Sequence, residues 1–150
     1  MAFQRHSIQN QTMMFVTTNI AQRQKIFLTP AFANEAVLAL YKTQQLHPFF
    51  LYGFVIMPDH CHFLLSVPEN GSISKIMHTF KRAVSFALDQ GSIWQSRFHI
   101  RYPEHTGEAL TYIHQNPVRA LLSASAEAYP WSSASGTYDV STLPNPILGQ

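Results

Sequence analysis

The stretch MPDHCHFLL, residues 57–65, contains the side chains best suited to chemistry in this sequence, His60 and His62. On a β-strand, residues two apart point to the same side, so both imidazoles project together while Cys61 faces the opposite layer. Neutral imidazole is the commonest metal ligand in proteins, and two on one strand suit the chelation of one ion. Two ordinary core or surface histidines are an equally available interpretation of so short a pattern.

A second polar pattern lies in TYIHQNPVRA, residues 111–120, where Tyr112 and Asn116 stand four positions apart. On one helix these side chains share a face, so Asn116 can add an oxygen ligand and Tyr112 can attack an electrophile that the metal holds. A phenol with a pKa of about 10 needs such help from a Lewis acid or a base. Taken singly, Tyr112 also fits a packed helix residue, and Asn116 fits a helix end before Pro117.

Other known sites built on the H-x-H pattern fit this sequence less well. The metallo-β-lactamase pattern H-x-H-x-D-H is excluded because Phe63, Leu64 and Leu65 follow the second histidine. An H-x-H that opens a (β/α)₈ barrel would need a chain of about 250 residues. A structural zinc site would ordinarily add cysteines, and Cys61 is the only one in the chain.

The spacing of apolar residues predicts the elements that must position these side chains. It predicts strands over residues 12–18, 49–57, 60–67 and 93–102, and helices over 31–45, from Ser72 to Gly91, and from Thr106 to about Gln115. Ser72 and Thr106 are predicted to cap the second and third helices, and the second carries an apolar stripe of Ile73, Ile76, Met77, Phe80, Val84 and Leu88. Pro58 and Asp59 predict a tight hairpin turn, and Pro117 predicts the end or a kink of the last helix. This order indicates an α+β, ferredoxin-like antiparallel sheet with helices packed on one face.

Length and composition indicate one compact globular domain over residues 1–150, with a short Pro- and Ser-rich C-terminal tail. The first fifteen residues show no basic start followed by an apolar run, and no stretch of about eighteen apolar residues occurs. We therefore expect no secretion signal and no membrane association. A single cysteine cannot form an internal disulfide, which favours a cytoplasmic location.

The net charge of +2 does not by itself suggest nucleic acid, but the distribution of charge does. Three acids and six basic residues lie between positions 75 and 119, and the basic residues are Lys75, Lys81, Arg82, Arg97, Arg101 and Arg119. We predict that these six contact DNA phosphates, although an ordinary solvated face would look similar. Trp94, Phe98 and Tyr102 can either stack on unpaired bases or pack in the core.

Taken together and in this order, MPDHCHFLL and YIHQNPVRA resemble the HUH single-strand DNA transposases that use one catalytic tyrosine, most of all the REP-associated tyrosine transposases. The resemblance runs from about residue 15 to residue 138 and includes SKIMHTFKRAVSFAL, WQSRF and YPWSSA. It implies that His60, His62 and Asn116 bind the metal and that Tyr112 is the nucleophile. Members of the family join single-stranded DNA to the tyrosine through a 5′-phosphate, free a 3′-hydroxyl and can reverse the step.

The resemblance further implies a metal-dependent enzyme that acts on single-stranded or hairpin DNA, and relatives differ in whether a homodimer shares the tyrosine helix. Mixed imidazole and amide ligation with open positions suits Mg²⁺ or Mn²⁺. Two alternatives stay open. One is a domesticated, non-catalytic binder of structured single strands, and the other is a phosphodiesterase that uses water.

Three positions depart from the family pattern. Asp59 stands where Asn is common, Leu121 where a small Gly is common, and His99 where an acid often follows the Arg-Phe pair. None of the three removes a metal ligand or the nucleophile. We expect them to affect target sequence and rate more than chemistry.

Overall fold

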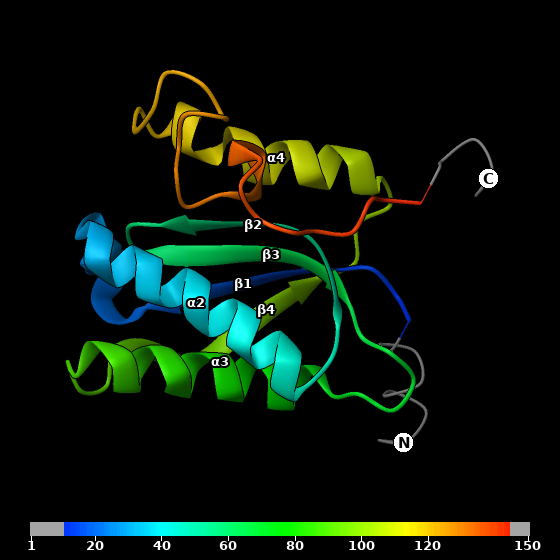
Figure 1. Cartoon of the computed structure of the whole chain (residues 1–150), viewed down its shortest axis with the longest axis horizontal. Helices are drawn as coiled ribbons and strands as arrows, with labels where there is room; N and C mark the ends of the chain where they lie inside the picture. Colours follow the sequence, from blue (N-terminus) through cyan, green and yellow to red (C-terminus); the bar gives the residue numbers. More distant parts are fainter. Residues whose placement is uncertain (1–10, 145–150) are drawn as a thin grey trace.

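Residues 11–144 are described by a computed structural model, in which four strands and three long helices form the frame (Figure 1). The strands are β1 Met14–Ile20, β2 Phe50–Met57, β3 His60–Ser66 and β4 Trp94–Arg101. The long helices are α2 Pro30–Leu46, α3 Ile73–Leu88 and α4 Thr106–Arg119, and short 3-10 turns are η1 Ala21–Arg23, η2 Ile26–Leu28 and η3 Ser133–Ser135. This element order confirms the prediction. The expectations for the first ten residues and the last six of the tail lie outside the described range.

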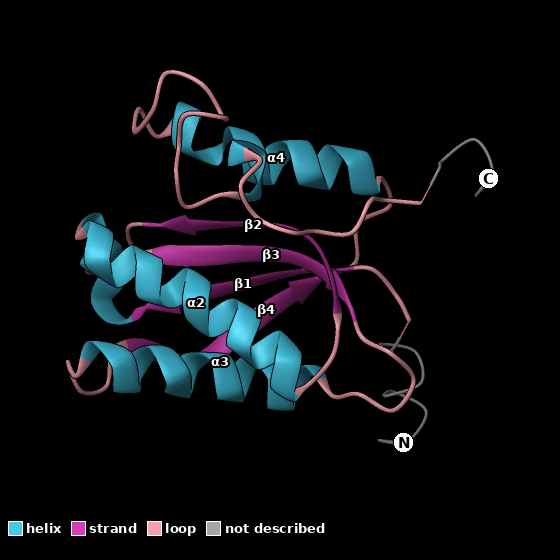
Figure 2. Ribbon diagram, in the orientation of Figure 1, coloured by secondary structure: helices cyan, strands magenta, loops and turns pink. Residues whose placement is uncertain are grey.

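The four strands form one antiparallel sheet with the order β2-β3-β1-β4 (Figure 2). The β2–β3 hairpin pairs Met57 with His60, so only Pro58 and Asp59 form its turn, as predicted. The central strand β1 places Thr17 opposite His62 on one side and opposite His99 on the other. The α+β, antiparallel plan is therefore confirmed.

Helices α2 and α3 cover one face of this sheet and enclose the larger core. The stripe predicted for α3 is buried, and its members are Ile73, Ile76, Met77, Phe80, Val84 and Leu88. Ser72 caps the helix as expected, since its Oγ accepts a hydrogen bond from the Lys75 backbone N at 3.2 Å. Cys61 points into this core and is fully buried.

Helix α4 lies over the opposite face of the sheet, so the expectation that all helices share one face holds only for α2 and α3 (Figure 1). Strand alternation leaves Phe15, Val55 and Leu64 on this second face, where they form a smaller core with Ile113 of α4. Apolar residues on both faces of a sheet need a cover on each side. Helix α4, which carries Tyr112, covers this second face.

Helix α4 also corrects the prediction of its two ends. Thr106 is its first residue, and the preceding His105 makes no side-chain capping bond. The helix runs through Pro117 to Arg119 instead of ending near Gln115. Pro117 lies in the last turn, so the N–H that it lacks removes a hydrogen bond only near the helix end, and the Leu122 backbone N donates to the Pro117 carbonyl at 2.8 Å. Strand β1 likewise begins and ends two residues later than predicted.

The segment after α4 returns to the sheet and covers the edge of β2. Ser132 forms a bridge with Val55, the Ile56 backbone N donates to Trp131 O at 2.8 Å, and the Tyr129 hydroxyl donates to Ile56 O at 2.7 Å. We call residues 129–139 the C-terminal strap. Strand β4, at the other end of the strand order, has only β1 as a neighbour within residues 11–144.

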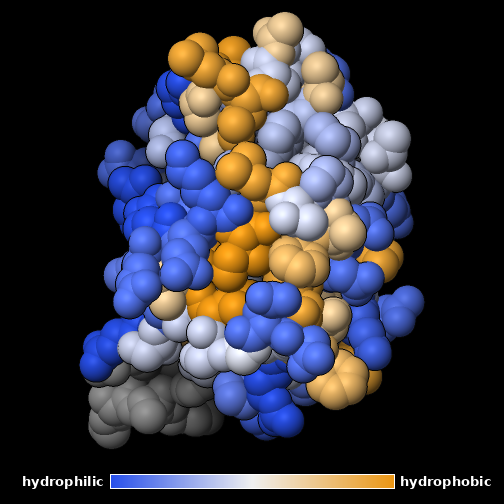
Figure 3. Space-filling model, turned by 90° about the vertical axis from the view of Figure 1, so that its left-hand side faces the viewer, coloured by the Kyte–Doolittle hydropathy of each residue, from blue (hydrophilic) through white to orange (hydrophobic). Residues whose placement is uncertain are grey.

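The surface at the end of the molecule that carries the β2–β3 turn contains both hydrophobic and hydrophilic residues. Figure 3 views this end and shows a band of hydrophobic residues bordered by hydrophilic ones. The loop after α4 contributes an exposed apolar residue, Leu121, which is 91% exposed and has a positive φ of 62°. None of the helices within residues 11–144 combines the length and the apolar character that crossing a membrane requires.

Candidate active site

The two histidines of β3 lie side by side on the sheet face that α4 covers. Their ring centroids are 4.7 Å apart, and the ring planes are inclined by 72°. His62 is buried, with 7% of its surface exposed, whereas His60 at the start of the strand is half-buried. The predicted pairing of the two imidazoles, with Cys61 on the other side, is therefore present.

His60 is held by the residue before it. Asp59 Oδ1 lies 2.6 Å from His60 Nδ1, and Asp59 Oδ2 accepts a hydrogen bond from Arg23 Nε at 3.1 Å. Because a carboxylate only accepts, the proton sits on Nδ1 and the lone pair remains on Nε2. Arg23 is thus held by the carboxylate through its Nε, and its Nη2 lies 3.3 Å from the protonated Nδ1 of His60. This is the arrangement in which a carboxylate orients a metal-binding histidine.

The pKa values of this pair agree with that arrangement. Burial lowers the pKa of His60 below its ordinary value, against the opposing effect of Asp59. Partial burial of Asp59 would raise its pKa, but the hydrogen bonds from His60 and Arg23 outweigh that effect and lower it. A neutral imidazole beside an ionised carboxylate is the state that offers Nε2 to a cation.

His62 is oriented by the neighbouring strand. Its Nδ1 lies 2.8 Å from the Thr17 hydroxyl, directly across the β1–β3 ladder. The hydroxyl can accept from Nδ1–H, which leaves Nε2 available. Burial lowers the pKa of His62 to about 3, with additional effects from His60, Arg101, Arg23 and Arg119. The ring is therefore uncharged at neutral pH.

Tyr112 of α4 lies next to His62 within the same chain. The two ring centroids are 5.8 Å apart, and the ring of Phe15 lies 5.9 Å from that of Tyr112. The tyrosine is 44% exposed, so a large substrate can reach it. Arg119 places its guanidinium carbon 4.3 Å from the Tyr112 ring centroid and donates from Nη2 to the Tyr112 carbonyl at 2.9 Å. A cation thus lies against the phenol ring.

Asn116 follows Tyr112 by about one turn of α4 and is half-buried. Within residues 11–144, no three side chains among His, Cys, Asp and Glu are gathered as a metal site. A cation at the histidine pair would therefore need oxygen from another kind of group, and the Asn116 amide meets that chemical requirement. The donor set of two imidazole nitrogens and a neutral oxygen fits a divalent metal ion.

The six predicted phosphate-binding residues separate into two groups. Arg101 and Arg119 lie near the histidines, since both lower the pKa of His62, and Arg101 Cζ lies 5.4 Å from the Phe15 ring centroid. Arg97 is four residues before Arg101 on β4, so both side chains lie on the same side of the strand. Lys75, Lys81 and Arg82 belong to α3, on the other face of the sheet.

An open cavity of about 470 Å³ adjoins the tyrosine. Tyr112, Phe15, Arg101 and Tyr102 are among the residues that line it, and Tyr102 is 46% exposed. Of the three predicted stacking residues, Trp94 and Phe98 pack against the larger core, which leaves Tyr102 as the exposed one. The cavity lies in the volume range of small-ligand sites, about 300–1,000 Å³.

Sequence reasoning missed two residues that orient the site, Thr17 and Arg23. Thr17 was placed in a strand, but its contact with His62 depends on the β1–β3 register. Arg23 lies in a 3-10 turn with a positive φ of 52°, for which the sequence carries no signal. His114, also on α4, contacts the strap, where its Nε2 lies 2.8 Å from Ser133 Oγ.

Comparisons with known proteins agree with this geometry. The model of the family described as "Transposase IS200 like" matches residues 8–116. A REP-associated tyrosine transposase of Escherichia coli is 27% identical over 135 residues, which cover 87% of this chain and 81% of that protein. A Haemophilus influenzae protein, provisionally given the same description, is 30% identical over 139 residues, which cover 81% of this chain and 78% of that one.

The fold has a solved counterpart. The structure of a REP-associated tyrosine transposase bound to a REP hairpin matches with a TM-score of 0.74 and 23% identity, over 91% of this chain and 87% of that one. That likeness supports the fold, and the family match with the 30% identical relative supports membership. The chain belongs to the IS200-like family of tyrosine transposases.

Proposed function

We propose that this transposase is metal-dependent and cleaves and rejoins single-stranded DNA through a 5′-phosphotyrosine intermediate, at hairpin-forming repeat elements. The observation that carries the proposal is the Tyr112 ring, 5.8 Å from the ring of His62 in the same chain. The substrate class is supported by the solved relative, which is bound to a REP hairpin.

His60, His62 and Asn116 would hold the divalent ion, Mg²⁺ or Mn²⁺. When bound, such an ion supplies Lewis-acid stabilisation of the charge on a phosphate oxygen. Asp59 and Thr17 orient the two imidazoles, at 2.6 and 2.8 Å from their Nδ1 atoms. Arg119 lies against the Tyr112 ring and Arg101 against the neighbouring Phe15 ring, so both add positive charge where a phosphate group would lie.

Tyr112 supplies the nucleophile. Its phenolic oxygen gives up a proton and bonds to phosphorus while the bond from phosphorus to the 3′ oxygen breaks. That oxygen takes up a proton and leaves as a 3′-hydroxyl. Attack by a 3′-hydroxyl on the phosphotyrosine reverses the step and joins two strands, so no nucleotide cofactor is consumed.

The tyrosine acts in cis in this proposal. Tyr112, His60 and His62 meet within one chain, so a homodimer is compatible with the site but not needed to complete it. A DNA substrate, together with the buried free thiol of Cys61, fits the cytoplasmic location expected from the sequence.

The test is the trapping of a covalent protein–DNA adduct. The wild-type protein, incubated with labelled hairpin DNA and Mn²⁺, is expected to give a denaturant-resistant adduct that a chelator prevents. Tyr112→Phe removes only the hydroxyl, so the adduct should disappear while DNA affinity stays within about twofold. An adduct that persists in Tyr112→Phe would refute the assignment of the nucleophile.

The same assay separates the two alternatives. A non-catalytic binder would retain the hairpin but give neither adduct nor cut with any divalent metal. A phosphodiesterase that uses water would cut the DNA without a trapped adduct, and Tyr112→Phe would still cut. Either result would replace the proposed function.

A further inference from the structure

Helix α2 is apolar on the side that faces away from the sheet as well as on the side that faces it. Leu40 lies in the larger core, whereas Leu38 and Leu46 are 55% and 60% exposed. Of the 17 residues of α2, only Glu35 and Lys42 are charged. A helix that is apolar all round is normally covered on every side. The outer side of α2 is therefore a surface suited to a partner.

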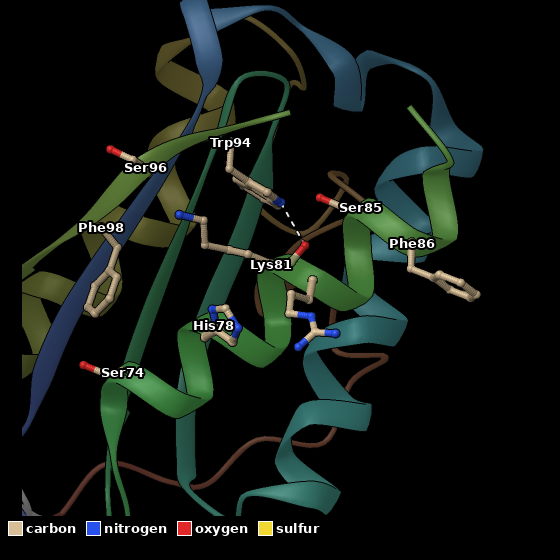
Figure 4. A pocket seen from close by; sticks show the side chains of 9 residues that line it. Ser74, His78, Lys81, Ser85, Phe86, Trp94, Ser96 and Phe98 are labelled. Atoms are coloured by element: carbon tan, nitrogen blue, oxygen red, sulfur yellow. Dashed lines mark hydrogen bonds between the residues drawn. The ribbon is translucent and has the colours of Figure 1, made fainter. Parts of the chain in front are cut away.

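An open groove of about 380 Å³ lies along this outer side, between α2 and α3. Figure 1 shows the two helices side by side on one face of the sheet. Phe86 of α3, which borders the groove, is 89% exposed, and Figure 4 shows its ring pointing away from the neighbouring α3–β4 cavity. Most of the side chains that line the groove are small or apolar, and these are Leu38, Ala39, Ala83, Phe86 and Ala87.

The two charges of α2 also line the groove, with an apolar residue between them. Glu35, Leu38 and Lys42 follow one another at intervals of three and four residues, so they share one side of the helix. At 1.5 Å per residue, the two charges are about 10 Å apart along the axis. Within residues 11–144 neither of them forms an ion pair. The groove thus has an acid at one end, a base at the other and an apolar centre.

A second copy of the chain matches this arrangement. When two α2 helices run antiparallel about a twofold axis between positions 38 and 39, Glu35 of each copy lies opposite Lys42 of the other. The same axis brings the two Leu38 side chains together and places Ala31 opposite Leu46. The surface is therefore complementary to itself in charge and in apolar character.

The size of the surface indicates how strongly two copies would associate. From Ala31 to Leu46 the stripe on α2 is about 22 Å long. Two helices side by side, each about 10 Å wide, present about 450 Å² over that length. Stable complexes bury about 800 Å² per partner, so this interface belongs to the weak, reversible class.

We propose that the α2–α3 groove is a homodimer interface, through which two copies of this chain associate reversibly with their α2 helices antiparallel. Tyr112 and the histidines lie on the opposite face of the sheet, so each copy keeps a complete and open site. The interface does not involve α4, and the inference does not rest on the proposed function.

Sedimentation velocity of the DNA-free chain, from about 1 to about 300 μM, measures the association by mass action. The wild-type protein should change from monomer toward dimer over this range. Glu35→Lys and Lys42→Glu, each alone, place like charges at both ends of the interface and should weaken association at least tenfold. Neither position forms an ion pair within residues 11–144, so both variants should unfold in urea as the wild type does.

Two combinations make the test specific to a twofold axis. The double variant Glu35→Lys with Lys42→Glu exchanges the two charges and should associate within threefold of the wild type. An equimolar mixture of the two single variants should form heterodimers, because the introduced lysine of one faces the introduced glutamate of the other. The native pair is kept at the other end of that heterodimer.

Matched controls lie outside the groove. Lys25→Glu makes the same change of charge at an exposed position and should leave association within twofold of the wild type. Phe86→Ala should weaken association about fivefold, whereas Leu28→Ala, which also removes an exposed apolar side chain, should not.

A chain that stays monomeric over the whole range overturns the proposal and leaves the groove to a partner of different sequence. A dimer that is insensitive to both charge reversals, or a double variant that does not recover, also overturns it. Adduct formation per chain should be equal in the wild type and in all these variants. A wild-type protein that forms no adduct refutes the proposed function, whereas adduct formation by a chain that stays monomeric refutes only the dimer interface.

Discussion

The two imidazoles of β3 are each engaged through Nδ1, by Asp59 for His60 and by Thr17 for His62. This leaves both Nε2 atoms free on rings whose centroids are 4.7 Å apart. These two hydrogen bonds differ in strength, because the bond to the Asp59 carboxylate is charge-assisted and the bond to the Thr17 hydroxyl is neutral. The departure from the family pattern at Asp59 therefore lies beside a proposed metal ligand.

Asp59→Asn tests whether that charge matters. The Asn carbonyl can still accept from His60 Nδ1, so the geometry is kept while the negative charge and the pairing with Arg23 are lost. We expect the affinity for Mn²⁺ to fall about tenfold, at the lower end of the roughly 10–100-fold effects of residues that orient metal ligands. The loss of the free Mn²⁺ signal in electron paramagnetic resonance measures the affinity directly.

The control for this variant is Asp89→Asn, an exposed aspartate at the C-terminus of α3 with a left-handed backbone that Asn also tolerates. It should leave Mn²⁺ affinity unchanged. If Asp59→Asn binds Mn²⁺ as tightly as the wild type, Asp59 only shapes the hairpin turn.

The sequence pattern predicted the residues of the candidate site but not the residues that orient them. His60 and His62 share a face because strand periodicity is local, and Tyr112 and Asn116 share one because helix periodicity is local. Their roles remain predictions, but their grouping needed no tertiary information. Thr17 lies 45 positions from His62, and such a contact follows from strand register, which one sequence does not specify.

At the level of elements, the position of α4 depends on a glycine of β2. A Cβ at Gly53 would collide with Leu110 Cδ1 of α4 and would lie 3.3 Å from Ser133 Oγ of the strap. The helix and the strap therefore approach this strand as closely as they do because position 53 has no side chain. Tyr112 lies two residues beyond Leu110 on α4, so a shift of the helix at this contact would also move the tyrosine.

Gly53→Ala should push α4 outward and move Tyr112 away from His62. We expect a loss of about 1–3 kcal/mol in the free energy of unfolding, as for other overpacked sites. The rate of adduct formation should fall by at least tenfold, while DNA affinity changes by less than threefold, because the cations stay in place. Urea unfolding and single-turnover adduct assays measure the two effects.

Two further variants make this prediction specific. Leu110→Ala in the Gly53→Ala background removes the colliding group and should restore much of the rate, a coupling that a double-mutant cycle quantifies. Gly107→Ala is the matched control, because an added Cβ there has no atom within 4 Å. An unchanged adduct rate in Gly53→Ala would show that the site tolerates movement of α4.

Most helices and strands could be predicted from local sequence patterns. The predictions were wrong where tertiary contacts determine the structure. The β2–β3 hairpin and the buried stripe of α3 were predicted because turn chemistry and helix periodicity are local signals. Pro117 disfavours helical geometry at Asn116, but burial of Pro117 and the bond from Leu122 N to its carbonyl stabilise the last turn. The face that α4 covers depends on the path of the chain after β4, which periodicity does not encode.

Over the whole molecule, the two faces of the sheet hold different groups of residues. The α2–α3 face holds the larger core, and the α4 face holds the histidines, the tyrosine and the smaller core. A small core gives limited stability, so α4 relies on additional attachments. The C-terminal strap supplies them through the His114–Ser133 contact and through hydrogen bonds made by tyrosine hydroxyls.

Two of these phenols make the strap sensitive to alkaline pH. The Tyr129 hydroxyl donates to Ile56 O and the Tyr41 hydroxyl donates to Asp139 O, both at 2.7 Å. Burial, followed by the charges of Asp139 and Tyr138, raises the pKa of Tyr41 to about 12. Burial, with a smaller effect from Cys61, also raises the pKa of Tyr129. In both cases the folded state keeps a proton that the unfolded chain releases above a pH of about 10.

The free energy of unfolding should therefore be constant with respect to these groups below pH 10 and should fall as the pH rises from 10 through 12. Tyr129→Phe removes one donor and should cost about 1–2 kcal/mol at pH 8, and both Tyr129→Phe and Tyr41→Phe should flatten the decline above pH 10. Urea unfolding at pH 8, 10, 11 and 12, followed by circular dichroism, measures both effects. Tyr102→Phe, at an exposed position outside the strap, should keep the wild-type slope. If the two strap variants decline as steeply as the wild type, these hydroxyls do not control the attachment of the strap.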